Sequence, residues 1–374
     1  MQRNSSPFLS IAIIVCSAAF ARGADYSITL INVGPAQTTT HITGINNSGQ
    51  IAGYSLEPST LFMHGFVYVN NTYANMISVV DQASVYIAGI NDSGVVTGYF
   101  STPNGDGAHA FLYSQEDGAI NLGSLGDQSL GLGINAAGQV TGYFQTNAEL
   151  LTSRAFLYSD GTMKDLGTLG GTWSMGMAIN ASGQVVGYSC LAGNNFSRAF
   201  LYSDGIMTDL GTLGLGGCND TFALAINDAG QITGQSYLDD GSPRAYLYDN
   251  GEMIDLGTLG GRRSAGLAIN NLGQVVGYSE SLPFDLFGNG PSHAFLYTDG
   301  QMIDLNSLID PASGWVLWEA TGINDAGQIV GNGYFNGIPH AFLLTPISVV
   351  PEPATLPVLA LATLALARRR RASV

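Results

Sequence analysis

Basic residues are scarce in this sequence. The 374 residues include 12 lysines and arginines against 28 aspartates and glutamates, which gives a formal net charge of −16. Four of the arginines are consecutive, at residues 368–371, so the rest of the chain is more acidic still. An acidic surface repels phosphate backbones, which excludes a nucleic-acid partner. It also suits a protein that stays soluble outside the cell.

Long hydrophobic runs are also few, and the first lies near the N-terminus. Arg3 precedes an apolar run at residues 8–20, and Ala19-Phe20-Ala21 has the small-x-small pattern of a cleavage site. This order is typical of a secretion signal, which we expect at residues 1–21. The run is too short to predict a membrane span.

The chain has only three cysteines, and one of them lies within the expected signal. The other two, Cys190 and Cys218, belong to one unit of the repeat described below. In an oxidising compartment they are predicted to form a disulfide, which the chain-entropy model values at roughly 3 to 4 kcal/mol of stability. The alternative is two free, buried thiols.

Sequence signatures of enzymes are absent. There is no G-x-S-x-G, H-E-x-x-H or CxxC motif, and LGTLGG lacks the lysine that a phosphate-binding loop requires. Carboxylates occur in pairs in some loops, but nothing in the sequence places two of them across a cleft. We therefore predict no catalytic residue, no metal site and no cofactor.

Glycine, in contrast, is abundant, with 50 residues, and many of them belong to a repeat. Seven copies of a motif such as AINASGQVVGYS, which begins at Ala178, run through the chain. The asparagines of the copies are Asn46, Asn91, Asn135, Asn180, Asn227, Asn270 and Asn324. Successive asparagines lie 43 to 54 residues apart. A period near 45 is typical of β-propeller blades.

Each copy is typical of a β-hairpin. A small residue, isoleucine and asparagine end one strand, a glycine completes the turn, and β-branched residues begin the next strand. The asparagine side chain can bond to its own backbone two residues on. We therefore assign the seven asparagines a structural role in the turn and not a catalytic one.

A second element follows every copy, as in HAFLY or RAFLY. It begins at His64, His109, Arg154, Arg198, Arg244, His293 and His340. In the second to sixth units it continues through a glycine-containing turn into another strand of the pattern MxDLG. Each unit thus has four predicted strands, which we call A to D in chain order.

Polar residues recur in strands C and D and are therefore candidates for a metal-binding or catalytic site. Arginine replaces histidine in three units at the start of strand C, and arginine is not a metal ligand. We expect this position to fix the start of the strand. The aspartates of strand D are explained in the same way by blade geometry; they are Asp165, Asp209, Asp255 and Asp304.

The two ends of the repeat array divide one unit between them. Residues 26–34 align with strand D, whereas the array closes with a strand C at residues 340–344. We therefore predict an all-β fold over residues 25–345, a seven-bladed β-propeller with four-stranded blades. The N-terminal strand is expected to join the last three strands and close the ring.

The loops of such a ring fall on two faces. The A-to-B and C-to-D turns are short and uniform and share one face, whereas the B-to-C and D-to-A loops are long and irregular and share the other. Binding residues are expected on the irregular face. The candidates are Trp173, Phe196, Asp239, Asp240, Phe284, Asp285, Phe287, Asn289, Trp315 and Trp318. Aromatic residues there can also simply cover the end of the core.

The C-terminal segment, residues 346–374, is tripartite. Pro351-Glu352-Pro353 precedes an apolar stretch at residues 354–367, and Arg368, Arg369, Arg370 and Arg371 follow. The apolar stretch is predicted to enter a bilayer as a short transmembrane helix, with the arginines on the cytoplasmic side.

This tail closely resembles the PEP-CTERM sorting signal of Gram-negative bacteria, and the repeat resembles the HAF family of extracellular repeat proteins. The resemblance implies export, transient anchoring by the C-terminal helix, and processing by an exosortase-type enzyme in organisms that make exopolysaccharide. It implies a location at the cell surface or in the extracellular matrix. The family has no settled activity, so the resemblance identifies no catalytic residue. Several units have RAF or RAY in place of HAF.

Two functions remain open from the sequence. The first is a non-catalytic surface or matrix protein that binds polysaccharide or another protein through the irregular face. The second is a secreted polysaccharide lyase or hydrolase with acidic residues on that face.

Overall fold

The computed structural model describes residues 25–31, 40–57, 60–69, 72–77, 79, 83–101, 107–147, 152–216, 219–282 and 290–347. The expected secretion signal, the predicted C-terminal helix at residues 354–367 and the arginines at 368–371 lie outside these ranges. Within the ranges, no helix is long and apolar enough to cross a membrane.

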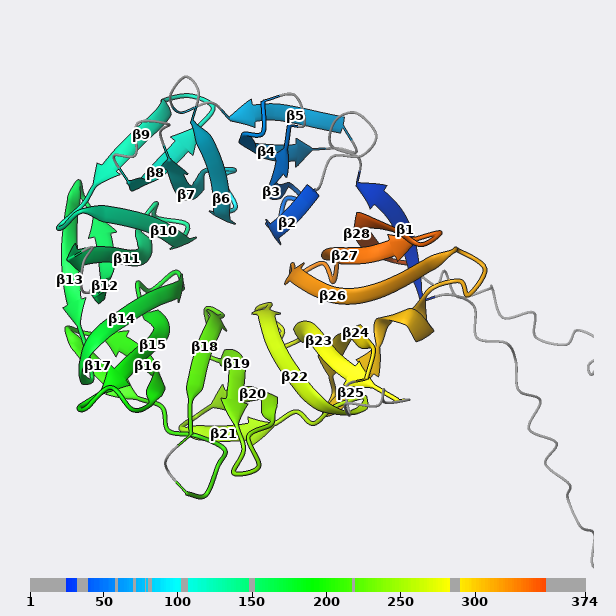
Figure 1. Ribbon diagram of the computed structural model, residues 1–374. Coiled ribbons are helices and arrows are strands. Elements are labelled where there is room, and N and C mark those ends of the chain that lie inside the picture. The colour runs from blue at the N-terminus through cyan, green and yellow to red at the C-terminus, as the bar shows by residue number, and fades with distance from the viewer. Residues whose placement is uncertain are drawn as a thin grey trace, which may run out of the picture.

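Seven four-stranded antiparallel sheets form a ring around a central channel (Figure 1). Blade 1 consists of β2 (Thr40–Ile45), β3 (Ile51–Leu56), β4 (Met63–Val69) and β5 (Thr72–Ile77). Blade 2 consists of β6 (Ser84–Ile90), β7 (Val96–Ser101), β8 (Ala108–Ser114) and β9 (Gly118–Gly123). Blade 3 consists of β10 (Gln128–Ile134), β11 (Val140–Asn147), β12 (Thr152–Ser159) and β13 (Thr162–Gly167).

The other four blades repeat this order. Blade 4 consists of β14 (Gly170–Ile179), β15 (Val185–Leu191), β16 (Ser197–Ser203) and β17 (Ile206–Asp209). Blade 5 consists of β18 (Thr221–Ile226), β19 (Ile232–Tyr237), β20 (Pro243–Asp249) and β21 (Glu252–Asp255). Blade 6 consists of β22 (Gly260–Ile269), β23 (Val275–Ser281), β24 (Ser292–Thr298) and β25 (Gln301–Asp304), and the 3-10 helix η1 (Leu305–Leu308) follows it. Blade 7 consists of β26 (Trp315–Ile323), β27 (Ile329–Phe335), β28 (Ile338–Pro346) and the N-terminal strand β1 (Tyr26–Ile31).

The predicted closure of the ring is confirmed. Strand β1 pairs antiparallel with β28, so Tyr26 lies opposite Pro346 and Ile31 lies opposite Ala341. Blade 7 is therefore built from both ends of the described chain, and β1 completes it as its outermost strand. The first unit also has a strand D, β5, whose sequence TYANMI lacks the MxDLG pattern.

The hydrophobic core lies between neighbouring blades. The third residue of every HAF-type element is a fully buried aromatic ring, and these are Phe66, Phe111, Phe156, Phe200, Tyr246, Phe295 and Phe342. Phe111 of blade 2, for example, packs in one cluster with Ala52 and Val67 of blade 1. Each such ring removes roughly 150 to 250 Å² of surface from water, so the seven rings dominate the packing between blades.

The presence of glycine in the QVVGY element of strand B has a steric explanation. Strand A of each blade has a register shift, such as the one between Gly131 and Gly133, and this brings its backbone close to strand B. A Cβ atom on Gly142 would lie 1.8 Å from the carbonyl oxygen of Leu130, and the equivalent glycines are similarly crowded. Only glycine fits at this position of strand B.

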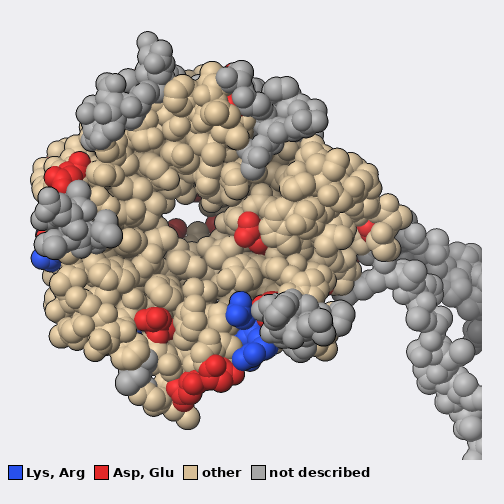
Figure 2. All heavy atoms as spheres, in the orientation of Figure 1, with Lys and Arg blue, Asp and Glu red and all other residues tan. Residues whose placement is uncertain are grey.

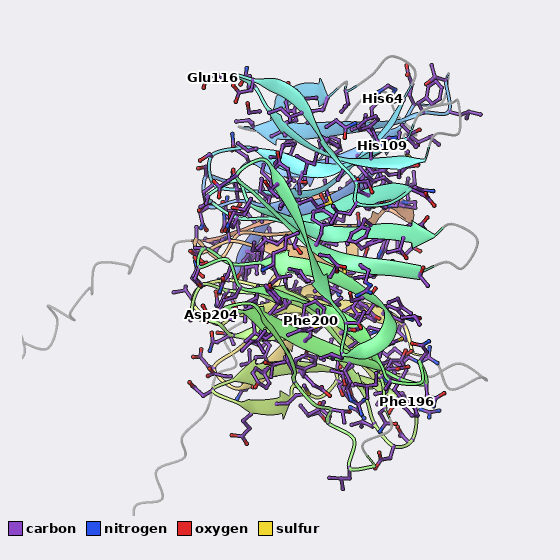
Figure 3. The ribbon with its side chains drawn as sticks, turned by 90° about the vertical axis from the view of Figure 1, so that its left-hand side faces the viewer. His64, His109, Glu116, Phe196, Phe200 and Asp204 are labelled. Carbon is purple, nitrogen blue, oxygen red and sulfur yellow. The ribbon has the colours of Figure 1, made fainter. Side chains whose placement is uncertain are left out.

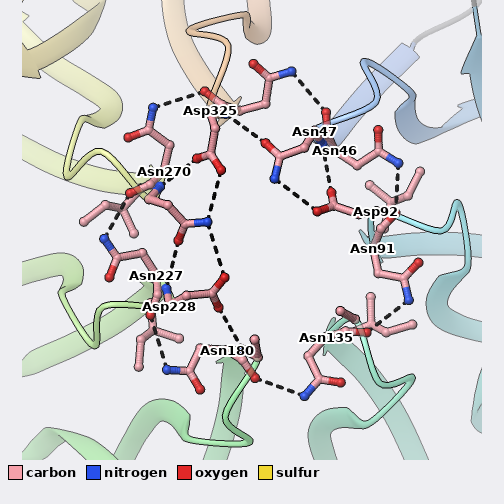
Figure 4. A pocket seen from close by; sticks show the side chains of 18 of the residues that line it. Asn46, Asn47, Asn91, Asp92, Asn135, Asn180, Asn227, Asp228, Asn270 and Asp325 are labelled. Atoms are coloured by element: carbon pink, nitrogen blue, oxygen red, sulfur yellow. Dashed lines mark hydrogen bonds between the residues drawn. The ribbon is translucent and has the colours of Figure 1, made fainter.

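The seven motif asparagines form a closed ring of hydrogen bonds around the channel (Figure 4). In each turn the side-chain oxygen accepts from backbone N–H groups, as Asn135 does from Ala137 and Gln139 at 3.1 and 3.0 Å. The amide nitrogen of Asn135 then donates to the carbonyl oxygen of Asn180 in the next blade, at 3.0 Å. Asn324 donates to the carbonyl oxygen of Asn46 at 3.1 Å and completes the circle. The structural role in the turn is confirmed, and the bond between blades is a second role.

The two kinds of loop lie on opposite faces, as predicted (Figure 3). Glu116 and Asp204, in C-to-D turns, lie on one face, whereas His64, His109 and Phe196 lie toward the other. We call these the short-turn face and the irregular face. The asparagine ring belongs to the A-to-B turns and so to the short-turn face.

Both ends of the described chain leave from the short-turn face. Tyr26 and Pro346 are paired at the end of blade 7. A Cβ atom on Gly327, in an A-to-B turn, would lie 3.3 Å from Pro346 and 4.0 Å from the Tyr26 hydroxyl. The irregular face is therefore free of both chain ends of the described propeller.

Removing one member of the asparagine ring should destabilise the whole propeller. Asn135→Ala deletes the bonds to two backbone N–H groups and to Asn180, and it leaves the buried carbonyl of Asn180 without this donor. We expect the free energy of unfolding to fall by about 2 to 4 kcal/mol in urea titrations. Asn195→Ala, in an exposed loop, is the control and should change it by less than about 0.5 kcal/mol. Equal unfolding curves for the two variants would contradict the role of the ring.

Candidate functional site

The recurring residues of strands C and D pair with each other in blades 3, 4 and 6. Arg154 lies 3.8 Å from Asp165, and the Nδ1 atom of His293 lies 2.6 Å from a carboxylate oxygen of Asp304. The second oxygen of Asp165 accepts from the backbone N–H of Gly167 at 2.7 Å. Histidine and arginine thus pair with the equivalent aspartate in different blades. In the part of the chain that the structure describes, no group of three histidine, cysteine or acidic residues could hold a metal ion.

The short-turn mouth of the channel is lined by the asparagine ring and by the residues that follow each asparagine (Figure 4). Three of these are Asp92, Asp228 and Asp325. Their carboxylates accept hydrogen bonds from the neighbouring blade, as Asp92 does from the backbone N–H of Asn47 at 2.9 Å. A ring of isoleucines and then small residues line the channel behind them. These carboxylates therefore join blades at the mouth.

The other end of the channel opens at the centre of the irregular face (Figure 2). Equivalent register pairs in strands A and B lie around this end, five residues before the ring asparagine on strand A, or roughly 15 Å along the strand. Most of these positions hold aromatic residues. We define the aromatic arc by the aromatic residues at these positions in blades 1 to 5 and by two rings that contact them, Trp173 and Tyr237. The residues at the register positions are His41, Tyr54, Tyr86, Tyr99, Tyr143, Tyr188 and Phe222.

The arc is made of two runs of touching rings. In blades 1 and 2, Tyr54 meets Tyr86 across the blade boundary with ring centroids 5.2 Å apart, and Tyr86 stacks on Tyr99 at 4.7 Å and 13°. In blades 4 and 5, Trp173 meets Tyr188 edge to face, and Tyr188 meets Phe222 in the same way at 4.8 Å. The rings are only partly buried, so part of each side chain is exposed to solvent.

Tyr143 of blade 3 lies near a tyrosine of each run. Burial, and then the neighbouring hydroxyls of Tyr86, Tyr54 and Tyr143, raise the pKa of Tyr99 to about 12. Burial, and then Tyr143, also raises the pKa of Tyr188. These hydroxyls lie near one another and stay protonated at neutral pH. The arc therefore presents uncharged rings together with groups that both donate and accept hydrogen bonds.

Acidic groups lie where the arc ends, at blades 6 and 7. Glu319 and Asn332 occupy the register pair that holds two tyrosines in blade 2, and Asn332 donates to Glu319 at 2.8 Å. Burial raises the pKa of Tyr278, and the charge of Glu319 contributes. Glu280 is 7% exposed and lies 3.8 Å from Arg263. Arg262 and Arg263 are exposed beside these carboxylates, so this end of the arc carries groups of both charges.

The structure does not gather the sequence-predicted binding residues into one site. Trp173 belongs to the aromatic arc, whereas Trp315 packs on the core ring of Phe342 with centroids 6.2 Å apart. Trp318 contacts Tyr334 at 4.5 Å, and Phe196 is partly buried on the irregular face. Phe284, Asp285, Phe287 and Asn289 lie outside the described residues.

The two acidic candidates bond within and beside their own loop. Asp239 accepts from the side chain of Asn219 at 2.8 Å. Asp240 accepts from the backbone N–H of Ser242 at 2.9 Å and from its hydroxyl, and these bonds lower the pKa of the Asp240 carboxyl. Both carboxylates thereby order loop backbone, although both remain exposed.

The cysteine pair stays a prediction. Cys190 is buried on β15, and burial raises the pKa of its thiol. Cys218 lies outside the described residues.

The tyrosines of the arc are the functional residues that sequence reasoning missed. Tyr54, Tyr99, Tyr143 and Tyr188 are the tyrosines of the Gly-Tyr pair in the repeat, which we interpreted only as strand formers. Their recurrence at the period of the repeat was the available signal. It becomes a site only because neighbouring blades place them side by side.

Comparison with known proteins identifies one matching region and the fold. A family model described as "Protein of unknown function (DUF3466)" matches residues 172–338, from blade 4 to blade 7. The chain thus carries a DUF3466 region within its propeller. A search of curated proteins finds no match.

Solved structures resemble the propeller at low identity. An oligogalacturonate lyase in complex with manganese is 13% identical with a TM-score of 0.55, over 87% of this chain and 94% of that one. A puromycin-hydrolysing peptidase of Mycobacterium tuberculosis is 11% identical with a TM-score of 0.54, over 84% of this chain and 52% of that one. The chain thus spans about half the length of that peptidase. Similarity at this level shows the fold alone.

Stability at alkaline pH should depend on Tyr99. Its pKa is raised from 10.0 to about 12, so between these values the folded state keeps a proton that the unfolded state has lost. Stability is therefore present below about pH 10 and is lost as the pH rises toward about 12. Tyr99→Phe should make this loss shallower in urea unfolding measured between about pH 9 and about pH 11. An unchanged slope in the variant would show that Tyr99 does not titrate in this way.

The paired role of strands C and D predicts which replacements are tolerated. His293→Arg should leave the free energy of unfolding within about 0.5 kcal/mol, because other blades place arginine against the same carboxylate. His293→Leu removes the donor to Asp304 and should cost about 1 to 2 kcal/mol in urea unfolding. A larger loss for His293→Arg than for His293→Leu would contradict this assignment.

Proposed function

We propose that this protein is an exported cell-surface or matrix propeller that binds exopolysaccharide without transforming it. The observation that supports this most is the aromatic arc on the irregular face. Partly exposed tyrosine and tryptophan rings bury a large apolar area on a partner at a small entropic cost, and their hydroxyls bond to its polar groups. This combination suits sugars, which present both apolar ring faces and hydroxyl groups.

The position of the chain ends agrees with the proposal. Both ends of the described propeller leave from the short-turn face, opposite the arc. An anchor formed by the predicted C-terminal segment would then leave the irregular face pointing away from the membrane. We propose that an exosortase-type enzyme processes that segment and releases the propeller to the cell surface or matrix.

The alternative function is that of a secreted lyase or hydrolase, and the acidic groups near the arc are its candidate catalytic residues. Glu319 and Glu280 lie there, but Glu280 is buried against Arg263, and Glu319 is bonded to Asn332. The oligogalacturonate lyase shares the fold at 13% identity, which brings no activity to this chain. We therefore keep binding as the proposed function.

The test measures retention and turnover together. Purified protein is passed over immobilised polysaccharide from the producing culture, and the eluate is assayed for new reducing ends and unsaturated sugars. We expect retention without product, and retention about tenfold weaker in a Tyr99→Ala/Tyr188→Ala variant, because two stacking rings are lost. Tyr158→Phe, in strand C beside the short-turn face, is the control and should be retained like the parent.

Two outcomes would overturn the proposal. Product that disappears in Glu319→Gln or Asp239→Asn would establish an enzyme. Equal retention of the arc variant and the parent would show that the arc is not the binding site.

The export part of the proposal is tested separately. A chain that lacks residues 346–374 should be secreted without being retained at the cell surface. Unchanged surface display of this shortened chain would contradict the sorting role of the C-terminal segment.

A further inference from the structure

Blade 2 carries an additional tyrosine at the irregular end of the channel. Strand B of blades 1, 2, 3, 4 and 6 has a tyrosine at the equivalent register position, and in blade 2 a second tyrosine lies opposite it on strand A. This pair is Tyr86 on β6 and Tyr99 on β7. The other blades have a different residue at this position of strand A, namely His41, Leu130, Met175, Phe222, Ala265 and Glu319. The packing of a blade therefore does not require a tyrosine there.

Tyr86 brings three tyrosine rings into contact. Its ring centroid lies 4.7 Å from that of Tyr99, with the ring planes 13° apart. It lies 5.2 Å from the centroid of Tyr54 in blade 1, with the planes 66° apart. Among the tyrosine side chains that the structure describes, these are the contacts that join one tyrosine ring to another. All three side chains are partly exposed, so a small oxidant in solvent can reach the cluster.

The hydroxyl ends of the three rings lie near one another. Burial, and then the hydroxyl of Tyr86, raise the pKa of Tyr54 and of Tyr99. Tyrosyl radicals couple through the ring carbons that are ortho to the hydroxyl, so these carbons are also close together. Groups held in contact react with each other far faster than the same groups free in solution. The cluster is therefore arranged for coupling within one molecule.

We propose that Tyr54, Tyr86 and Tyr99 form an oxidation site at which Tyr86 is joined covalently to Tyr54. The product is a dityrosine bridge that links blade 1 to blade 2. The oxidant is hydrogen peroxide acting through a haem peroxidase. This inference is independent of sugar binding.

The coupling removes two electrons and two protons from the protein. Tyr54 and Tyr86 each lose one electron and the hydroxyl proton, and the two radicals form a carbon–carbon bond between their ortho carbons. Each of these carbons then loses its proton while each oxygen regains one, which restores both hydroxyls. One hydrogen peroxide accepts the two electrons and two protons and becomes two water molecules.

The geometry favours Tyr54 over Tyr99 as the partner of Tyr86. Tyr86 and Tyr99 are directly opposite on adjacent strands, where Cβ atoms are roughly 4.5 to 5.5 Å apart. The bond of a dityrosine lies in the planes of both rings, which requires a wider separation of the Cβ atoms than a facing pair has. Tyr54 belongs to a different sheet and approaches Tyr86 at 66°. Tyr99 stays in contact with Tyr86 and can pass an oxidising equivalent to it.

Oxidation of the full chain with hydrogen peroxide and a haem peroxidase tests the inference. The protein is kept dilute, so that coupling between molecules is slow. We expect a monomer with dityrosine fluorescence, a mass lower by two hydrogen atoms, and a linked peptide pair that contains Tyr54 and Tyr86 after proteolysis. The linked protein should unfold at a higher urea concentration than the unlinked protein, because the bridge closes a loop of the unfolded chain.

Variants then assign the bridge. Tyr86→Phe keeps the ring but has no hydroxyl proton to lose, so it should lower the dityrosine yield at least about fivefold. Tyr86→Leu introduces the residue that blade 3 has at this position, Leu130, and should lower the yield equally. Tyr99→Phe leaves the coupled pair intact and should lower the yield less. Tyr158→Phe, on strand C, is the control with the parental yield, and thermal unfolding checks that each variant keeps the fold.

Three outcomes would overturn the inference. The first is a dityrosine yield in both Tyr86 variants that equals the yield of the parent. The second is a bridge that joins Tyr86 to Tyr99, or that joins two copies of the chain, because blades 1 and 2 would then not be linked. The third is oxidation of the tyrosines without any dityrosine. None of these results affects retention on polysaccharide, so the proposed function is tested separately.

Discussion

One side-chain amide, repeated seven times, holds this propeller together. Each ring asparagine closes its own turn through its oxygen and bonds to the next blade through its nitrogen, and Asn324 returns the chain of bonds to Asn46. An asparagine can do both because its amide donates and accepts at the same time. The segment that recurs with the least variation, the A-to-B turn with its asparagine, is therefore the segment that joins blades. It lies on the short-turn face.

That constraint leaves the opposite face free to vary. The spacing of the asparagines ranges from 43 to 54 residues, and the B-to-C and D-to-A loops on the irregular face take up the difference. Around the opening on that face, strands A and B bring tyrosines of neighbouring blades into contact. The scaffold and the candidate site are thus at opposite ends of the same strands, and both described chain ends are on the scaffold side.

The period of the repeat and its divided unit were enough to predict seven blades, the closing strand β1 and the two faces. Bonds between blades were not predictable, because the partner of Asn135 lies 45 residues away and local patterns show only the turn. The arc was missed for the same reason: Tyr54 meets Tyr86 only after two blades pack. Trp315 is conspicuous in the sequence, yet its ring packs on the core.

The central claim is that the repeat builds a scaffold whose tyrosines bind sugar at the irregular end of the channel. Determining the structure with an oligosaccharide of the producing culture's exopolysaccharide bound tests it most directly. The account predicts sugar along the arc, within about 4 Å of Tyr99 and Tyr188. Sugar bound at the asparagine ring on the short-turn face, with the arc empty, would contradict it.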